Sequence, residues 1–130
     1  MIVIDASALT EVLLQTRAAP KVSERLFRRG ETLAAPHLID VEIAQVLRRY
    51  EAGGQLDESR AREALADMAD MPLTRYPHVV LLQRIWELRH YMTAYDAAYV
   101  TLAEALEVPL VTRDSGLARA PGHHAVIELL

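Results

Sequence analysis

Short apolar runs alternate with longer amphipathic segments along this chain, and that alternation restricts the fold more than any other feature of the sequence. Apolar runs of a few residues have the length of buried strands, whereas apolar stripes with a period of 3.6 residues indicate helices. Strands separated by helices pair in parallel, and the helices cover both faces of their sheet. The sequence therefore predicts an α/β fold, a three-layer α/β/α sandwich with a mainly parallel sheet of about four or five strands.

The bounds of these elements follow from the apolar pattern and from the residues that punctuate it. Gly30 and Gly53 are expected to end two helices, and Asp57 to cap another. We expect strands over 2–5, 32–35, 73–76, 109–112 and 125–129, and helices over 7–17, 20–30, 37–53, 57–71, 78–89, 94–107 and 115–120. The helix over 20–30 is expected to direct Phe27 inward. The helix over 78–89 is expected to direct Val79, Leu82, Ile85 and Trp86 inward. A chain of 130 residues, 52% of them hydrophobic, fits a single domain over 1–130.

Composition excludes several kinds of chemistry. The absence of cysteine rules out disulfides, zinc–thiolate sites and thiol nucleophiles, and it suits a reducing cytoplasm. The apolar run at the N-terminus is too short for a signal peptide or a membrane span, so we expect a cytoplasmic protein that does not bind membranes. The net charge of −4 argues against a nucleic-acid binder. A bound divalent cation would weaken that objection. All basic residues except Lys21 are arginines, which suit phosphate contacts, although genome base composition can produce the same bias.

Four carboxylates are the candidate site. Asp5 and Asp114 each follow a predicted strand, Glu42 lies early in a helix, and Asp96 opens another helix. Ligands of parallel sheets bind beyond the carboxyl ends of the strands, where these acids can gather. Acids gathered in this way repel one another unless a cation holds them, and oxygen ligands favour Mg²⁺ or Mn²⁺. The sequence therefore indicates a magnesium site.

Each acid also has an ordinary structural interpretation. Asp5 and Asp114 stand where helix-capping residues do, and the segment from Thr93 to Asp96 has the spacing of a capping box. A capping role and a ligand role are compatible, because backbone amides keep a carboxylate ionised and oriented. Glu42 and Asp40 border opposite sides of the same apolar stripe, so periodicity leaves both open.

Basic and aromatic residues near these acids are candidate contacts for a substrate. Arg49 lies seven residues after Glu42 on nearly the same helical face, and Arg113 adjoins Asp114. Both can hold phosphates, or can instead face solvent or form ion pairs. The tyrosines at 91, 95 and 99 recur every four residues and could stack on bases. For Tyr95 and Tyr99 the shared stripe with Leu102 and Leu106 favours core packing. The five histidines form no metal-binding pattern.

Four motifs occur in an order that resembles a known family. The chain resembles PIN-domain ribonucleases, most closely the VapC toxins of toxin–antitoxin pairs, over nearly its whole length. The motifs are Val3-Ile4-Asp5-Ala6-Ser7-Ala8-Leu9, Glu42-Ile43-Ala44-Gln45-Val46-Leu47-Arg48-Arg49, Tyr95-Asp96-Ala97-Ala98-Tyr99-Val100-Thr101-Leu102-Ala103 and Leu110-Val111-Thr112-Arg113-Asp114. The extra acid at Asp40 and the absence of diagnostic residues between 53 and 91 depart from the pattern.

The resemblance implies a PIN-like fold and a metal-dependent endoribonuclease. It puts the catalytic acids at Asp5, Glu42, Asp96 and Asp114, with Asp5 and Asp96 as direct metal ligands and with Ser7 and Thr112 behind them. It implies Mg²⁺, or Mn²⁺, as cofactor and RNA as substrate. It also implies a cognate antitoxin and a second subunit as partners, with Arg17, Arg25, Arg28 and Arg29 near the surface that meets them. No protein nucleophile is expected, so water attacks the phosphodiester.

Other classes of protein remain alternatives. A phosphotransfer receiver domain also gathers acids around magnesium, but it carries a lysine after its last strand, and the lysine here is Lys21. A haloacid-dehalogenase-type phosphatase needs an aspartate two residues after the first, where this chain has Ser7. A non-catalytic interaction module would use the acids as caps only.

Overall fold

Every pair of neighbouring strands in this structure, a computed structural model that describes residues 1–130, runs parallel. The five strands form one sheet in the order β3-β2-β1-β4-β5. Their bounds are β1 Ile2–Ile4, β2 Leu33–Pro36, β3 Leu73–Tyr76, β4 Leu110–Thr112 and β5 Ile127–Leu129. The predicted α/β fold is confirmed, and the sheet is parallel throughout.

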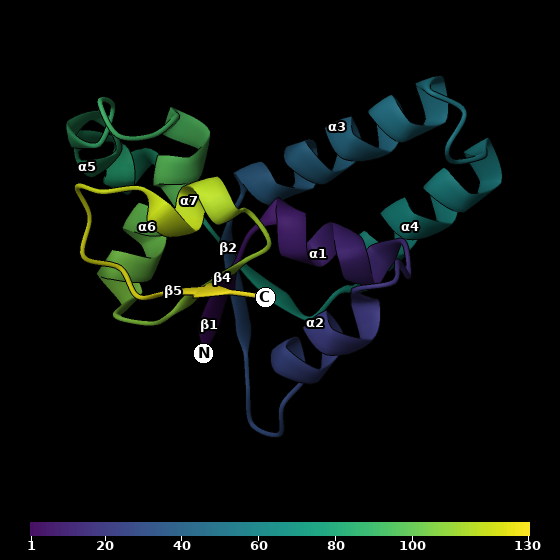
Figure 1. Cartoon of the computed structure of the whole chain (residues 1–130), viewed down its shortest axis with the longest axis horizontal. Helices are drawn as coiled ribbons and strands as arrows, with labels where there is room; N and C mark the ends of the chain where they lie inside the picture. The colour runs from purple at the N-terminus through teal and green to yellow at the C-terminus, as the bar shows by residue number, and fades with distance from the viewer.

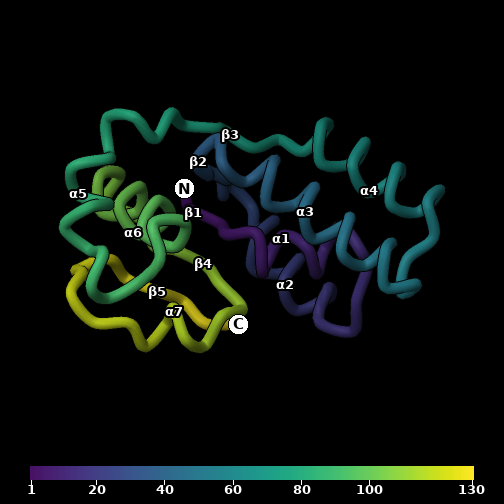
Figure 2. The backbone as a smooth tube through the Cα atoms, turned by 90° about the horizontal axis from the view of Figure 1, so that it is seen from above, coloured from purple at the N-terminus to yellow at the C-terminus, as the bar shows by residue number.

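Helices cover the sheet on both faces, which makes the three layers of the sandwich. Figures 1 and 2 show α1 to α4 on one side of the sheet and α5, α6 and α7 on the other, with the α3–α4 pair projecting beyond the sheet. The helices are α1 Ala6–Leu13, α2 Ala19–Leu26, α3 Leu38–Ala52, α4 Glu58–Asp70, α5 Leu82–Glu87, α6 Ala94–Leu106 and α7 Ser115–Arg119, and a 3₁₀ turn, η1, covers Val79–Leu81. No helix combines the length and the apolar character needed to cross a bilayer.

The central strands are buried on both faces. Every residue of β1, β2 and β4 is buried, as expected for a parallel sheet between two helical layers. On the face of α5 to α7, α6 contributes an unbroken buried segment, Ala97–Ala103. The core thus fixes β1, β4 and α6 firmly against one another.

The order of the strands opens a crevice beside β1. The chain moves from β1 outward to β2 and β3, and then crosses back to add β4 on the other side of β1. The helices that follow β1 and those that precede β4 therefore lie on opposite faces, and a crevice forms between them at the carboxyl ends of β1 and β4. The pairing of Ile4 with Val111 brings Asp5 beside Thr112 at this edge.

The inward face predicted for the segment 78–89 is wrong at three positions. Val79, Leu82 and Trp86 are 69%, 53% and 68% exposed. The reason is the 3₁₀ turn, whose period of about 3.0 residues shifts the buried face of the helix that follows it. Ile85 is buried as predicted, and the other inward positions are taken by Leu81 and Leu88.

The two N-terminal helices are also shorter than predicted. The first ends at Leu13, and the second ends at Leu26, before Gly30 is reached. Phe27, expected in the core, is consequently the C-terminal cap of α2 and is about half exposed. The predicted cap at Asp57 is confirmed, since its carboxylate accepts a hydrogen bond from the Arg60 amide at 2.8 Å.

Candidate active site

Asp5 is the most firmly held of the four acids. It directly follows β1 and caps α1, because its Oδ1 accepts hydrogen bonds from the Ala8 amide at 3.0 Å and from the Ser7 hydroxyl at 2.7 Å. The Thr112 hydroxyl donates to its Oδ2 at 2.5 Å. Burial raises the pKa of Asp5, these hydrogen bonds oppose the rise, and the charge of Asp114 adds to it. Capping and membership of the site therefore coexist in this residue.

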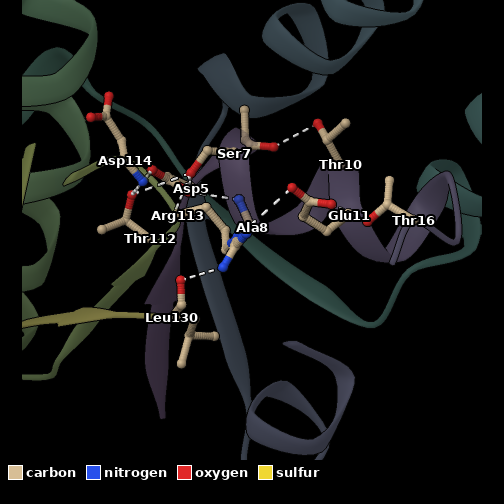
Figure 3. Close-up of polar contacts among 11 residues, drawn as sticks. Asp5, Ser7, Ala8, Thr10, Glu11, Thr16, Thr112, Arg113, Asp114 and Leu130 are labelled. Carbon is tan, nitrogen blue, oxygen red and sulfur yellow. Dashed lines mark hydrogen bonds and ion pairs between the residues drawn. The ribbon is translucent and has the colours of Figure 1, made fainter. Parts of the chain in front are cut away.

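Ser7 and Thr112 link the ends of β1 and β4, as Figure 3 shows. Their hydroxyl oxygens lie 3.2 Å apart, and each contacts Asp5. Backbone amides complete the network, because the amide of Arg113 donates to Ser7 at 2.9 Å and the amide of Asp114 donates to Thr112 at 2.9 Å. The network fixes the two strand ends, and with them Asp5 and Asp114, in one orientation.

Asp114 caps α7 through one oxygen only. Its Oδ1 accepts from the amides of Gly116 at 2.7 Å and Leu117 at 3.1 Å. No hydrogen bond reaches Oδ2, and the residue is exposed. The capping role predicted as an alternative is thus present, and one carboxylate oxygen remains for another partner.

Glu42, in the second turn of α3, carries the most perturbed carboxylate of the site. Its Oε1 is buried without a hydrogen-bond partner. Burial raises the pKa of Glu42 to about 7, and the charges of Asp96 and Asp5 act in the same direction. The nearby Tyr99 phenol opposes that rise, although its hydroxyl is likewise buried without a hydrogen bond in good geometry. A buried, unpaired carboxylate oxygen is costly and is a common mark of a functional site.

Asp96 lies in the first turn of α6, where only half of the predicted capping box forms. Its amide donates to the Thr93 hydroxyl at 3.1 Å, but its carboxylate accepts no hydrogen bond from the Thr93 amide. Burial raises the pKa of Asp96, with further increases from the charges of Asp114 and Asp5. The carboxylate is therefore left to the site.

The four acids line one cavity of about 430 Å³, which we call the acid cavity. Its lining includes Asp5, Glu42, Asp96 and Asp114 together with Ser7 and the predicted phosphate contacts Arg49 and Arg113. Tyr99 also lines this cavity, three residues after Asp96 on the same face of α6. The core packing that the sequence favours for Tyr99 is confirmed for its ring, which is buried. The spacing from Asp96 was the signal that its hydroxyl would reach the site.

Asp40, the competitor of Glu42, belongs elsewhere. Its two oxygens accept bonds from Nε and an Nη of Arg75 at 2.7 and 2.8 Å, in the forked geometry of a strong ion pair. Arg75 lies on β3, away from the end of β1, and Asp40 does not line the acid cavity. Glu42 is therefore the α3 acid that faces the site.

The two candidate arginines differ in what already binds them. Arg113 donates from Nη1 to the Leu130 carbonyl and lies 3.8 Å from Glu11 (Figure 3). Arg49 is exposed at the rim of the cavity and makes no ion pair or side-chain hydrogen bond. Arg49 is consequently the guanidinium that is available to a ligand. In the group near the first two helices, Arg25 is buried in an ion pair and is not part of a basic surface.

The cavity carries the kind of oxygen donors that a divalent cation requires. All four acids supply hard oxygen atoms, and Glu42 has a buried oxygen that lacks a partner, both of which fit Mg²⁺ or Mn²⁺. No three of the acids converge closely enough to make a metal cage by themselves. The chemistry of the residues fits a cation, whereas their spacing alone does not define its position.

Replacing Glu42 with Gln is expected to remove a pH dependence of stability. The pKa of Glu42 is about 7 in the folded chain against an ordinary value of 4.5, so the folded state holds this proton more tightly than the unfolded state. The free energy of unfolding therefore falls as pH rises from about 4.5 to about 7, and this contribution is constant above that range. Over this pH range the free energy of unfolding should decrease by roughly 1 to 2 kcal/mol, after allowance for screening by water.

Urea denaturation in EDTA buffer between about pH 4.5 and about pH 8 measures this contribution as the difference between wild type and Glu42→Gln. A difference that stays constant over the whole range would contradict the expected proton uptake by Glu42.

A family model described as "PIN domain" matches residues 2–123 of this chain. Two relatives from Mycobacterium tuberculosis are similar over nearly their full lengths. Ribonuclease VapC1 is 42% identical, over 98% of this chain and 96% of its own, and ribonuclease VapC12 is 41% identical, over 100% and 99%. Both matches span all four acidic motifs.

A solved structure shares the fold at low sequence identity. The crystal structure of VapBC2 from Rickettsia felis bound to a promoter DNA fragment contains a chain that superposes with a TM-score of 0.72. That match covers 99% of this chain and 98% of the other, at 15% identity. At this identity the likeness concerns the fold alone.

Proposed function

The chain belongs to the PIN-domain family, as its four motifs predicted, and from this premise we propose that it is a metal-dependent endoribonuclease. The observation that carries the proposal is the meeting of Asp5, Glu42, Asp96 and Asp114 in one cavity, with an unpaired buried oxygen on Glu42. The ribonuclease names of relatives at 41 to 42% identity support RNA as the substrate. The same relatives support a role as the VapC toxin of a toxin–antitoxin pair.

Asp5 and Asp96 are the proposed direct ligands of Mg²⁺ or Mn²⁺, and Asp114 completes the acidic set. A cation held by these residues would supply a water molecule of lowered pKa and positive charge for the phosphate oxygens. Ser7, Thr112 and the Ala8 amide hold Asp5 in a fixed orientation for this role.

Water is the proposed nucleophile, because the cavity has no cysteine and burial raises the pKa of the Tyr99 phenol, which keeps that hydroxyl protonated. The Ser7 hydroxyl is engaged with Asp5, Thr112 and the Arg113 amide. We assign the proton of the attacking water to Glu42, whose Oε1 accepts no hydrogen bond and whose pKa of about 7 suits a general base. Arg49 at the rim contacts a phosphate of the bound strand.

The assay that tests this function is cleavage of end-labelled RNA. The wild-type protein should cut RNA with Mg²⁺, stop in EDTA, and recover when Mg²⁺ is added in excess. We further propose that the product of a small neighbouring reading frame binds and inhibits it, as an antitoxin, and that the protein acts as a homodimer. Absence of cleavage of any RNA with either Mg²⁺ or Mn²⁺ would favour a non-catalytic interaction module.

Two acids of the same helix provide a matched pair of variants. Glu42→Gln is expected to reduce the single-turnover cleavage rate by about 10²- to 10³-fold, because the proton acceptor is lost. Asp40→Asn weakens a partly exposed ion pair with Arg75 and should leave that rate within about threefold. If Asp40→Asn lost as much activity as Glu42→Gln, the assignment of the catalytic acid on α3 would be wrong.

A further inference from the structure

A second groove, of about 440 Å³, adjoins the acid cavity. The two share Glu42, Val46 and Arg49, so the groove is continuous with the site. Its other walls include Val41 and Tyr95, each of which directly precedes an acid of the site in the chain. Any group seated in the groove therefore lies beside the proposed point of cleavage.

Two of the apolar side chains that line this groove, Val41 and Tyr95, have no role in the core. Tyr95 is 64% exposed and Val41 is 70% exposed. The core packing that the sequence favoured is confirmed for Tyr99, which is buried, and is wrong for Tyr95. The physical reason is position along α6, since Tyr95 lies in the first turn, before the buried segment Ala97–Ala103 begins. An exposed aromatic ring in the same groove as an exposed aliphatic side chain is available to a planar ligand.

We propose that this groove binds the base of an unpaired RNA nucleotide next to the scissile phosphate. Tyr95 stacks on the base, Val41 and Val46 contact it from the groove wall, and Arg49 holds the adjoining phosphate. The inference rests on the proposed ribonuclease function and adds a base-binding subsite to it.

Charge and shape favour a nucleotide over a protein segment as the occupant. Arg49 is the cation at the shared border and has no acidic partner, which suits a phosphate. The volume of the groove lies within the range of about 300 to 1,000 Å³ that is usual for small-ligand sites. A base can reach Tyr95 only when it is out of a helical stack, so cleavage should be confined to loops and single strands. Stacking is tolerant of base identity, so the subsite selects for unpaired structure more than for sequence.

The test compares Tyr95→Ala, Tyr95→Phe and Trp86→Ala on one RNA whose cleavage position has been mapped. Tyr95→Ala should weaken binding by roughly 5- to 150-fold, the range found when a stacking aromatic is removed. Tyr95→Phe keeps the ring and should bind as the wild type does. Trp86→Ala removes an aromatic residue of similar exposure outside the groove, and it should have no effect on binding. Binding is measured in an Asp5→Asn background, so that the RNA stays intact.

An abasic substitution in the RNA identifies the stacked position. At one nucleotide beside the cleavage site, removing the base should weaken binding by the wild type but not by Tyr95→Ala, because the contact is already lost in that variant. Equal losses in both proteins at every position would overturn the inference.

The failures of the two proposals are distinguishable. If the wild type cuts RNA and Tyr95→Ala binds RNA equally well, the base-binding subsite is wrong and the ribonuclease function stands. If Tyr95→Ala binds RNA normally but loses affinity for the purified product of the neighbouring reading frame, the groove is a protein-docking site and the inference is overturned. If the wild type cuts no RNA, both proposals fail.

Discussion

Replacing Asp5 with Asn is expected to reduce RNA cleavage by at least about 10²-fold, the scale on which loss of one charge-stabilising group in an active site acts. The same substitution should leave the protein at least as stable as the wild type in metal-free buffer. Burial and the charge of Asp114 raise the pKa of Asp5, so its ionised form costs stability at neutral pH. Loss of activity would thus coincide with retained or increased stability.

The hydrogen bonds around Asp5 can survive this change. An asparagine oxygen in place of Oδ1 still accepts from the Ala8 amide and the Ser7 hydroxyl. Its amide nitrogen can donate to the Thr112 hydroxyl, which can in turn donate to Ser7, 3.2 Å away. The neutral side chain therefore fits the same network without a buried charge.

Thermal unfolding with and without Mg²⁺ separates the structural and functional effects. Mg²⁺ should raise the Tm of the wild type, because a ligand that binds only the folded state stabilises it, and the rise should be largely absent in Asp5→Asn. A variant that cuts RNA at the wild-type rate, or that gains the same Tm from Mg²⁺, would contradict the assignment of Asp5 as a metal ligand.

Replacing Arg25 with Ala is expected to lower the free energy of unfolding by about 3 kcal/mol, the lower end of the range for breaking a buried ion pair. Nε and Nη2 of Arg25 donate to both oxygens of Glu128, at 2.6 and 3.0 Å, and Nη1 donates to Glu31 at 2.9 Å. Glu31 also binds the N-terminal amine at 2.8 Å. Arg25 therefore connects α2 to β5 and to the start of the chain. Its loss leaves the Glu128 carboxylate without a hydrogen-bonded cation, whereas Glu31 keeps the N-terminal amine.

Acid should diminish this effect. The Arg25 guanidinium lowers the pKa of Glu128, so the contribution of this pair is present above the ordinary glutamate pKa of 4.5 and is lost as pH falls through the lowered value. The matched control is Arg62→Ala, which removes an exposed pair with Glu58 worth about 0.3 to 0.5 kcal/mol. Urea denaturation of both variants at neutral and acidic pH measures the effect. If the two variants lost the same free energy of unfolding at neutral pH, the ion pairs of Arg25 with Glu128 and Glu31 would contribute no more than an exposed surface pair.

Structural features that depend on residues close in sequence were predicted well. The strand over 73–76 and the cap at Asp57 were predicted at their observed positions, because each depends on residues close in sequence. Asp5 and Asp114 were found in the same way, since each follows a buried strand and precedes a helix. Order along the chain was enough to assemble the four acids through a family resemblance, but not to place them in space.

Features that depend on packing between distant segments were not determined by the pattern. The exposure of Trp86 follows from a 3₁₀ turn that shifts the buried face, and the exposure of Tyr95 follows from where the covered part of α6 begins. Arg25 carries a charge, which favours the surface in any single-residue argument, yet contacts with Glu128 from the far end of the chain bury it. Such contacts are invisible to a local periodicity.

By itself, the sequence determined the layered α/β class and a mainly parallel sheet, because the alternation of apolar runs is a local property. Its resemblance to a family then singled out the four candidate acids. Only the tertiary structure decided between Glu42 and Asp40. Both acids border the same apolar stripe of α3, so periodicity does not distinguish them. Arg75, on a distant strand, binds Asp40, whereas Glu42 lines the cavity with Asp5 and Asp96. The base-binding groove was decided in the same way, since its walls come from two helices that meet only when the sheet brings them together.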